Sequence, residues 1–565
     1  MSAPQPQIPA DEVETSKPTW ATLRQVGPAM LTVVFCVVVT YLVPELEFAR
    51  PLTPEDPLPF WNLIGRPFES GEAQEQEQHH EEVEDFAREA LAEASAAAPP
   101  PRPDPVEIVE LDEGDALPAY VPQPGDDEAP VRSIELFTGH ELDRFLESLA
   151  YSDEGVARKL HAEGGEGGEG AEEGEAGEAG ERSEVAVTRV VHWGDSVIGI
   201  DGIPGAIRQR MQARFGDAGH GFHAITPPNT SYRHREVDFE TNGKWSKCFI
   251  IFRCKDDGRY GLGGVTAWSA GGGQSRFAPS EKHSSGRVGR FDVAYMAQPR
   301  GGKLKLQLDD REPVFIETAT EGELIEDRFH SFEVEDGAHE LQLRASGGGQ
   351  VRLYGVTLER EVPGVVWNSL ALVGAFTSRL GELDEDHLRT QLGHRPVALA
   401  VFMFGGNDMT RKYMKQEEYE QELAAVVQKV RRADPELDCL IMSPLDHGKR
   451  EGVRIVSLPI VPMLVAAQRN VAKAEGCAFF DTWSAMGGDG SAGRWYKQSP
   501  RLIGGDLGHA TAKGHVVIGE MIYRAILEQY VAYRTRDEDD APAPEPEPAP
   551  EPEPATPSGG SPDPN

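Results

Sequence analysis

Residues 188–196, TRVVHWGDS, join a run of apolar and β-branched residues to a Gly-Asp-Ser turn. We predict a strand at Val187–Val191 and, after the turn, a helix at Ile203–Phe215. Two more pairs follow the same order, a strand at 397–404 before a helix at 416–432 and a strand at 439–443 before a helix at 459–474. Strands that alternate with helices predict βαβ units and a parallel sheet. We therefore expect an α/β domain.

A different pattern covers residues 228–362. Short stretches of alternating apolar and polar residues, such as GKLKLQLDD at 302–310 and QVRLYGVTLER at 350–360, are separated by turns that contain glycine. Such a series is typical of antiparallel strands in a β-sandwich. We expect an all-β, jelly-roll-like sandwich that interrupts the α/β domain.

Charge is distributed very unevenly along the chain. The net charge is −39 over 565 residues, and most of it falls in 68–130, 161–185 and 535–565. These segments combine Glu with Pro, Ala or Gly, and such sequences bury too little apolar surface to offset the entropy of ordering. The acidic balance also argues against a nucleic-acid partner, because phosphate contacts need a basic surface.

An apolar run without charges, VGPAMLTVVFCVVVTYLV at 26–43, lies near the N-terminus. Its 18 residues would just span a hydrocarbon core of ~30 Å as a helix. Lys17 and Arg24 precede it, and no small-residue cleavage pattern ends it. We expect a single-pass signal anchor in a bacterial inner membrane, with the body of the chain on the periplasmic side. A cleaved signal peptide and a buried core helix are the alternatives.

The expected organisation follows from these patterns. Residues 133–160 show helical periodicity, with Leu142, Phe145, Leu146 and Leu149 on one stripe. The expected segments are a cytoplasmic N-terminus (1–25), the transmembrane anchor (26–43), a disordered acidic linker (44–132), a helical segment (133–160), an acidic Gly/Glu loop (161–185), the α/β domain in two parts (186–227 and 363–534) around the β-sandwich (228–362), and a disordered Pro/Glu tail (535–565).

Five cysteines are too few for a disulfide scaffold, and their spacing does not fit a zinc site. A Cys248–Cys254 bridge and two unpaired thiols both stay open at this stage. We expect no metal ion and no cofactor.

Three short motifs follow predicted strands of the α/β domain. GDS at 194–196 would expose a serine hydroxyl on a sharp strand-to-helix turn. GGND at 405–408 would bring backbone and an Asn amide close to a developing oxyanion, and DLGH at 506–509 spaces a carboxylate and an imidazole for a hydrogen bond. Each motif alone is more typical of a turn or helix cap. All three fall where parallel sheets hold active sites, at the carboxyl ends of strands.

Taken together, these motifs resemble the blocks of the SGNH/GDSL hydrolase superfamily: Gly-Asp-Ser, a lone Gly, Gly-x-Asn-Asp and Asp-x-x-His. The resemblance implies a three-layer α/β/α fold and a serine esterase. It assigns the nucleophile, base and orienting acid to Ser196, His509 and Asp506. The implied oxyanion donors are the backbone N–H groups of Ser196 and Gly374, in ALVGAF, and the amide of Asn407. The residues expected to support these loops are Gly194, Asp195, Gly405, Gly406 and Asp408.

Longer stretches are similar to bacterial peptidoglycan O-acetylesterases, in which an SGNH domain carries an inserted carbohydrate-binding-like β-sandwich. The similar stretches are HWGDS (192–196), RQRMQARFGDAGHGF (208–222), WSAMGGDGSAGRWY (483–496) and DLGHATAKGH (506–515). The similarity covers roughly 186–534. Two departures lie outside the proposed triad: Val197 stands where relatives commonly have His, and His515 where they commonly have an aromatic residue.

This similarity predicts an esterase that removes O-acetyl groups from a cell-envelope carbohydrate, with O-acetylated peptidoglycan as the expected partner. The alternatives are a non-catalytic wall-binding protein on the same scaffold and an O-acetyltransferase that uses the same acyl-enzyme. Trp268 and Tyr260 of the insert would stack on sugars if exposed, although burial in the sandwich is the stronger expectation. The side chains expected to be surface or satisfied loop residues are His192, His220, His223, His447 and Asp481.

Overall fold

The computed structural model describes residues 82–92, 108–111, 116–160, 182–282 and 284–536. The expected anchor at 26–43, nearly all of the acidic loop and nearly all of the tail lie outside these residues. Within the described part, no helix combines the length and apolarity that a membrane crossing needs.

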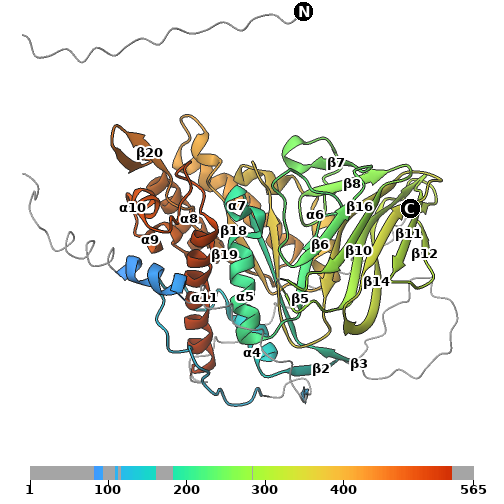
Figure 1. Cartoon of the computed structure of the whole chain (residues 1–565), viewed down its shortest axis with the longest axis horizontal. Helices are drawn as coiled ribbons and strands as arrows, with labels where there is room; N and C mark the ends of the chain where they lie inside the picture. Colours follow the sequence, from blue (N-terminus) through green and yellow to red (C-terminus); the bar gives the residue numbers. More distant parts are fainter. Residues whose placement is uncertain (1–81, 93–107, 112–115, 161–181, 283, 537–565) are drawn as a thin grey trace, which may run out of the picture. The chain divides into compact units, whose positions relative to one another are not determined.

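A five-stranded parallel sheet forms the centre of the α/β part (Figure 1). Its strand order is β17 (Gly364–Ala371), β4 (Val187–Gly194), β18 (Leu399–Met403), β19 (Asp438–Met442) and β22 (Ala478–Phe480). All four strand pairs are parallel. The strands are buried along nearly their whole length because both faces of the sheet are covered.

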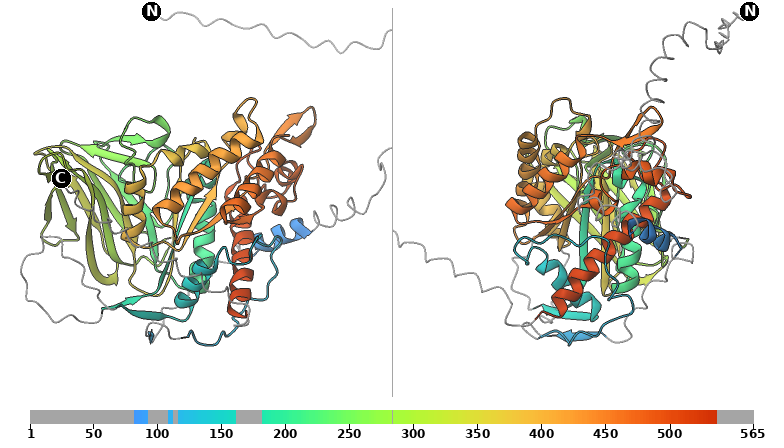
Figure 2. Two further views of the ribbon diagram at one scale, coloured as in Figure 1. Left: turned by 180° about the vertical axis from the view of Figure 1, so that it is seen from behind. Right: turned by 90° about the vertical axis from the view of Figure 1, so that its left-hand side faces the viewer.

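Helices cover the two faces of this sheet. Val190 and Val401 belong to the same core cluster as α4 (Asp143–Asp153), α5 (Ile203–Phe215) and α11 (Ala512–Arg534). Val191 and Phe402 belong to the opposite cluster, because successive strand residues point to opposite faces. The helices of that cluster are α6 (Glu385–His394), α7 (Gln416–Ala433) and α8 (Val461–Glu475). The right-hand view of Figure 2 shows these orange helices on one side and the red α11 on the other.

The predicted α/β domain is therefore confirmed, with α5 at the expected bounds. Shorter elements complete it. They are the helices α9 (Thr482–Ala485) and α10 (Ser491–Lys497), the hairpin β20 (Gly448–Glu451) and β21 (Arg454–Ser457), and the 3-10 turns η2 (Ser196–Asp201), η4 (Thr377–Glu382) and η5 (Asp408–Thr410).

The insert consists of two sheets that are almost wholly antiparallel, as expected. Phe277 and Leu306 of one sheet and Phe291 and Val356 of the other share one buried core. One sheet contains β6 (Val237–Thr241), β9 (Gln274–Pro279), β11 (Lys303–Leu308), β12 (Val314–Glu317) and β15 (Leu341–Ala345). The other contains β5 (Gly219–His223), β7 (Ser246–Phe249), β8 (Val265–Ser269), β10 (Val288–Pro299), β13 (Ala319–Thr320), β14 (Glu326–Gly337) and β16 (Val351–Glu359). Since β5 pairs with β16, the boundary predicted at 228 lies too late in the chain.

The prediction of a disordered linker over 44–132 is wrong for its described residues. Residues 82–92 form a helix, and Val83, Phe86 and Ala90 are buried in the cluster that contains α11. Their spacing is that of an apolar helix face, which the Glu-rich composition of the whole segment concealed. Farther along, the buried Asp126 carboxylate accepts from the Arg214 guanidinium at 2.9 Å.

The prediction of one helical segment over 133–160 also needs correction. Only α4 is helical within it, although its predicted apolar stripe is buried as expected. Residues 156–160 instead form β2 (Val156–Leu160), which pairs with β1 (Val109–Leu111) and β3 (Arg182–Val185). The helical spacing of 142–149 does not continue past the turn at Gly155, whose φ of 68° favours glycine.

Two disulfides join four of the cysteines, Cys248 to Cys254 and Cys439 to Cys477. The first pairing was left open by the sequence. The second was not anticipated, because its cysteines are 38 positions apart and meet only where β19 lies beside β22.

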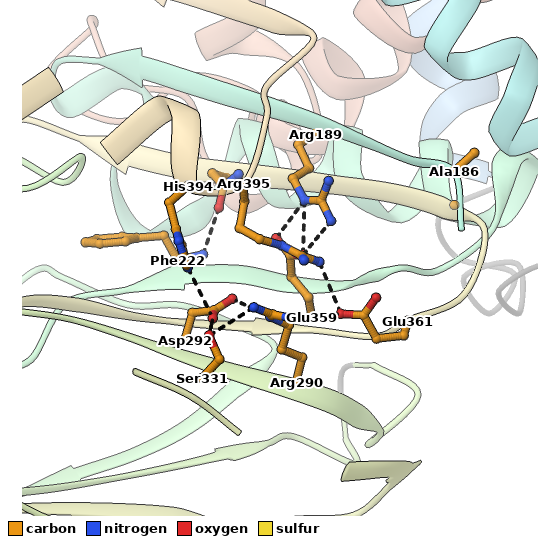
Figure 3. Close-up of polar contacts among 12 residues, drawn as sticks. Ala186, Arg189, Phe222, Arg290, Asp292, Ser331, Glu359, Glu361, His394 and Arg395 are labelled. Carbon is orange, nitrogen blue, oxygen red and sulfur yellow. Dashed lines mark hydrogen bonds and ion pairs between the residues drawn. The ribbon is translucent and has the colours of Figure 1, made fainter. Parts of the chain in front are cut away.

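A network of buried charges joins the insert to the α/β part (Figure 3). Glu359 on β16 is buried between Arg189 of β4 at 2.9 Å and Arg395 at 2.6 Å. Asp292 on β10 pairs with Arg290 at 2.9 Å and faces His394 of α6 at 3.3 Å. These contacts hold the two folded parts together through charges from both.

Candidate active site

The Gly194–Ser196 turn begins at the carboxyl end of β4. A Cβ on Gly194 would lie 2.5 Å from the Met403 carbonyl oxygen, so only glycine fits there. Asp195 is fully buried and caps η2, where its carboxylate accepts from the Val197 N–H at 2.9 Å. Burial raises the pKa of Asp195, although the hydrogen bonds and the nearby His447 oppose the shift.

Ser196 meets His509 and Asp506 across 313 positions of sequence. The Ser196 Oγ lies 2.8 Å from His509 Nε2, and His509 Nδ1 lies 2.7 Å from Asp506 Oδ2. Partial burial alone would raise the pKa of Asp506, but hydrogen bonds from His509 and from the Gly508 N–H hold it below its usual range. An ionised Asp506 fixes the ring so that Nδ1–H donates to it and Nε2 faces the serine.

The Gly405–Asp408 loop is tied to the serine turn by Asp195. The second oxygen of Asp195 accepts from the Gly406 N–H at 2.8 Å and from the Asn407 N–H at 3.4 Å. Gly405 has a φ of 124°, a conformation that favours glycine. The loop therefore carries Asn407 to a defined position beside Ser196.

Asn407 and Asp408 also hold the segment that contains Gly374. Asn407 Nδ2 donates one hydrogen to the Ala375 carbonyl at 3.1 Å, which leaves its second amide hydrogen for another acceptor. Asp408 accepts from the Thr377 N–H at 3.1 Å and from its hydroxyl at 2.9 Å, and burial raises the pKa of Asp408 to about 6. Gly374 itself is exposed, with a φ of 86°.

A cavity of about 230 Å³ lies over these groups. Its lining comprises Asp195, Ser196, Val197, Gly406, Asn407, Thr410, His447, Asp506, Gly508 and His509. The side chains of His509 and Asp506 are 48% and 55% exposed, so the site is shallow and open. Gly374 is not part of this lining.

The expectation that most of five other polar residues are surface or satisfied loop residues is wrong for three histidines. His192 in β4 and His220 and His223 in β5 are buried strand residues, whereas Asp481 is a satisfied loop residue that caps α9. His447 lines the cavity. Its Nδ1–H donates to the Leu445 carbonyl at 3.0 Å, so its Nε2 is an acceptor, and this atom has no hydrogen-bond partner among the described residues.

A signal for His447 was present in the sequence. It follows the predicted strand at 439–443 and thus stands at the carboxyl end of a parallel strand, like the three motifs. The aromatic candidates of the insert are not free for stacking. Tyr260 is buried, and Lys255 Nζ lies 4.1 Å from the centre of the half-buried Trp268 ring.

The parallel sheet and the Ser–His–Asp hydrogen-bond chain together are typical of one class of protein, the hydrolases of α/β fold with a serine nucleophile. Residues 337–517 match the model of the GDSL-like Lipase/Acylhydrolase family, so this part of the chain is similar to that family's domain. The match begins after Ser196, because the insert separates the serine strand from the rest of the domain. Strand β4 nevertheless lies inside the same sheet.

Among solved structures, a peptidoglycan O-acetylesterase is similar at 20% identity and a TM-score of 0.51, covering 61% of this chain and 92% of that one. A family two carbohydrate esterase from Cellvibrio japonicus matches at 11% identity and a TM-score of 0.21, covering 52% and 99%. No curated protein matches the sequence. The first structure supports the fold, and the family match supports a carboxylic ester hydrolase.

Proposed function

We propose that the chain is a serine esterase that removes O-acetyl groups from a cell-envelope carbohydrate, with peptidoglycan as its substrate. The observation that carries the proposal is the unbroken hydrogen-bond chain from Ser196 through His509 to Asp506, at 2.8 and 2.7 Å. An imidazole held in this way can take the serine proton as the hydroxyl attacks an ester carbonyl.

In the proposed reaction, the Ser196 oxygen bonds to the acetyl carbonyl carbon while its proton moves to His509 Nε2. The oxyanion that forms is stabilised by the Ser196 and Gly374 N–H groups and by the free amide hydrogen of Asn407. The carbon–oxygen bond to the sugar then breaks, and His509 returns the proton to the sugar oxygen. Water next attacks the acetyl-Ser196 ester, again through His509, and acetate leaves.

Two features favour a polymeric substrate. The open site, with His509 and Asp506 about half exposed, would be shielded from water by a large substrate lying across it. His447 Nε2 offers an acceptor within the same cavity. A sugar hydroxyl or amide N–H next to the acetyl ester is a donor that suits it.

The test is acetate release by the full chain from O-acetylated peptidoglycan, compared with acetylxylan and a simple aryl acetate. We expect release from peptidoglycan, and Ser196→Ala should abolish turnover on all three substrates while the protein stays folded. Substantial residual turnover in Ser196→Ala would reject the nucleophile. Transfer of acetyl to an added glycan in place of acetate release would indicate an acetyltransferase.

We further propose that residues 26–43 anchor the chain in the inner membrane with its catalytic part outside. This segment lies outside the described residues, so the proposal rests on its length and lack of charge. Fractionation with the inner membrane is the expected result. A soluble mature protein that begins near residue 45–50 would instead indicate cleavage.

A further inference from the structure

Two arginines share one tyrosine ring beside the candidate active site. The Cζ of Arg450 on β20 lies 5.1 Å from the ring centre of Tyr496, and the Cζ of Arg501 lies 4.3 Å from it. Both arginines are exposed, and neither has a carboxylate within ion-pair distance among the described residues. We call Arg450, Tyr496 and Arg501 the arginine pair site.

The charge at this site is uncompensated. The hydrogen bond from Arg450, followed by the charge of Arg501, holds the pKa of the Tyr496 hydroxyl below its usual range. Arg454 and Lys497 are also exposed there and also lack a carboxylate partner in the described part of the chain. Elsewhere in this acidic protein, arginines such as Arg189 and Arg214 are paired with carboxylates.

Backbone hydrogen bonds connect both arginines to the loop that carries His509. The Gly448 N–H, two residues before Arg450, donates to the Leu507 carbonyl at 2.7 Å. In the segment that follows Arg501, the Gly504 N–H donates to the His509 carbonyl at 2.8 Å. Arg501 is three residues before Gly504, which corresponds to roughly 10 Å of extended chain.

The β20–β21 hairpin and helix α10, which carry Arg450 and Tyr496, are tightly packed against each other. A Cβ on Gly448 would lie 2.8 Å from Ile455 Cγ2, and Gly493 on α10 also faces Ile455. Tyr496 lies one helical turn after Gly493, so it presents its ring on the same side of α10 as the hairpin. The position of the arginine pair site relative to His509 is therefore set by backbone rather than by flexible side chains alone.

We propose that the arginine pair site binds a carboxylate of the polymeric substrate while the acetyl ester lies at Ser196. Each guanidinium presents a planar fork of donors that matches a carboxylate, and the shared Tyr496 ring holds both forks in one small area. The inference deepens the proposed function, on which it rests: the substrate is an acidic polymer rather than a neutral acetylated one. Most of the net charge of −39 lies in the acidic segments and not in this region, so this local positive surface would guide how an acidic polymer approaches.

Binding of the full chain to insoluble peptidoglycan without O-acetyl groups tests the site without turnover. In a sedimentation assay, the double variant R450Q/R501Q should bind about tenfold more weakly than the native chain, the usual effect of losing a charged hydrogen bond. Raising the ionic strength should weaken native binding much more than binding of the double variant. Equal binding by the two proteins would overturn the proposal.

The matched control is Arg344→Gln, an exposed arginine of β15 in the insert with no ion pair among the described residues. It should bind as the native chain does, and an equal loss in this variant would indicate nonspecific charge attraction and overturn the proposal. An amidase that removes the stem peptides leaves a new carboxylate on the sugar, so competition distinguishes the carboxylate source instead. Free stem peptide that displaces the native chain from peptidoglycan assigns the carboxylate to the peptide, whereas arginine-dependent binding that free peptide does not displace assigns it to the sugar chain.

Turnover provides the second measurement. The rise in KM of R450Q/R501Q on O-acetylated peptidoglycan should exceed any change on aryl acetate or acetylxylan by at least about fivefold. An equal change on all three substrates would make the arginines structural. If the native chain releases no acetate from any polymer, the proposed function fails, while the binding assay still decides the anion site.

Discussion

One amide hydrogen of Asn407 binds the Ala375 carbonyl at 3.1 Å, and the other has no hydrogen-bond partner among the described residues. We predict that Asn407→Ala lowers kcat on an aryl acetate by about 10²–10³, the usual cost of one oxyanion donor. Steady-state kinetics with a thermal unfolding control will check this. If only KM changes, Asn407 binds the substrate in its ground state and does not stabilise the oxyanion.

His447 offers a second test at the scale of single residues. Its ring lies against Gly508, where a Cβ would be 2.6 Å from His447 Cδ2, and Phe would keep this packing while removing the Nε2 acceptor. We predict that His447→Phe raises KM on the glycan by about 2–10-fold, the value of one neutral hydrogen bond. The change on aryl acetate should be smaller. A larger loss of kcat on aryl acetate than on the glycan would contradict a role in sugar binding.

Strand β4 shows how one element serves both stability and the site. It ends at the serine turn, and within it His192 is fully buried, with Nδ1 accepting from the Trp367 indole at 3.3 Å and Nε2 unpartnered. Burial lowers the pKa of His192 to about 3. Between about pH 6.5 and 3, the unfolded chain therefore binds a proton that the folded chain excludes, and stability falls as the pH falls.

We predict that His192→Gln reduces this acid dependence. Gln can accept from the Trp367 indole but does not titrate, so the slope of unfolding free energy against pH should decrease by up to about 1.4 kcal/mol per pH unit below pH 6. Urea unfolding at several pH values will measure it. An unchanged slope would mean that the folded chain protonates His192 as readily as the unfolded chain does.

On the scale of the whole molecule, the insert and the α/β part are joined through Glu359. Burial alone would raise the pKa of this carboxyl, but Arg189 and Arg395 hold it below its usual range. We predict that Glu359→Gln costs about 3–5 kcal/mol of unfolding free energy, because two arginines lose their buried counter-charge. The native chain should unfold in one transition, measured by denaturant titration followed at both domains.

The control is Glu317→Gln, which removes an exposed partner of Lys303 at 2.7 Å and should cost less than about 1 kcal/mol. Two separate transitions in the native chain would show that the network does not couple the domains.

Much of the fold could be predicted because it depends on neighbouring residues. Apolar spacing identified α5 and the strands around it, and turn chemistry located the GDS, GGND and DLGH motifs at strand ends. The helix at 82–92 was not predicted, because local sequence shows only part of what stabilises it. Its apolar face is short, and its burial depends on α11, which is hundreds of positions away.

By itself, the sequence determined the α/β and all-β division and the residue types of the site, since periodicities of 2 and 3.6 and turn preferences are local properties. Only the tertiary structure decided which distant groups meet: Ser196 with His509, Cys439 with Cys477, and Arg450 with Arg501 on one ring. The tertiary structure also places His447, which we expected to be a surface or loop residue, in the lining of the cavity. The physical reason is that strand order and loop packing minimise the free energy of the whole chain, which no contiguous stretch encodes.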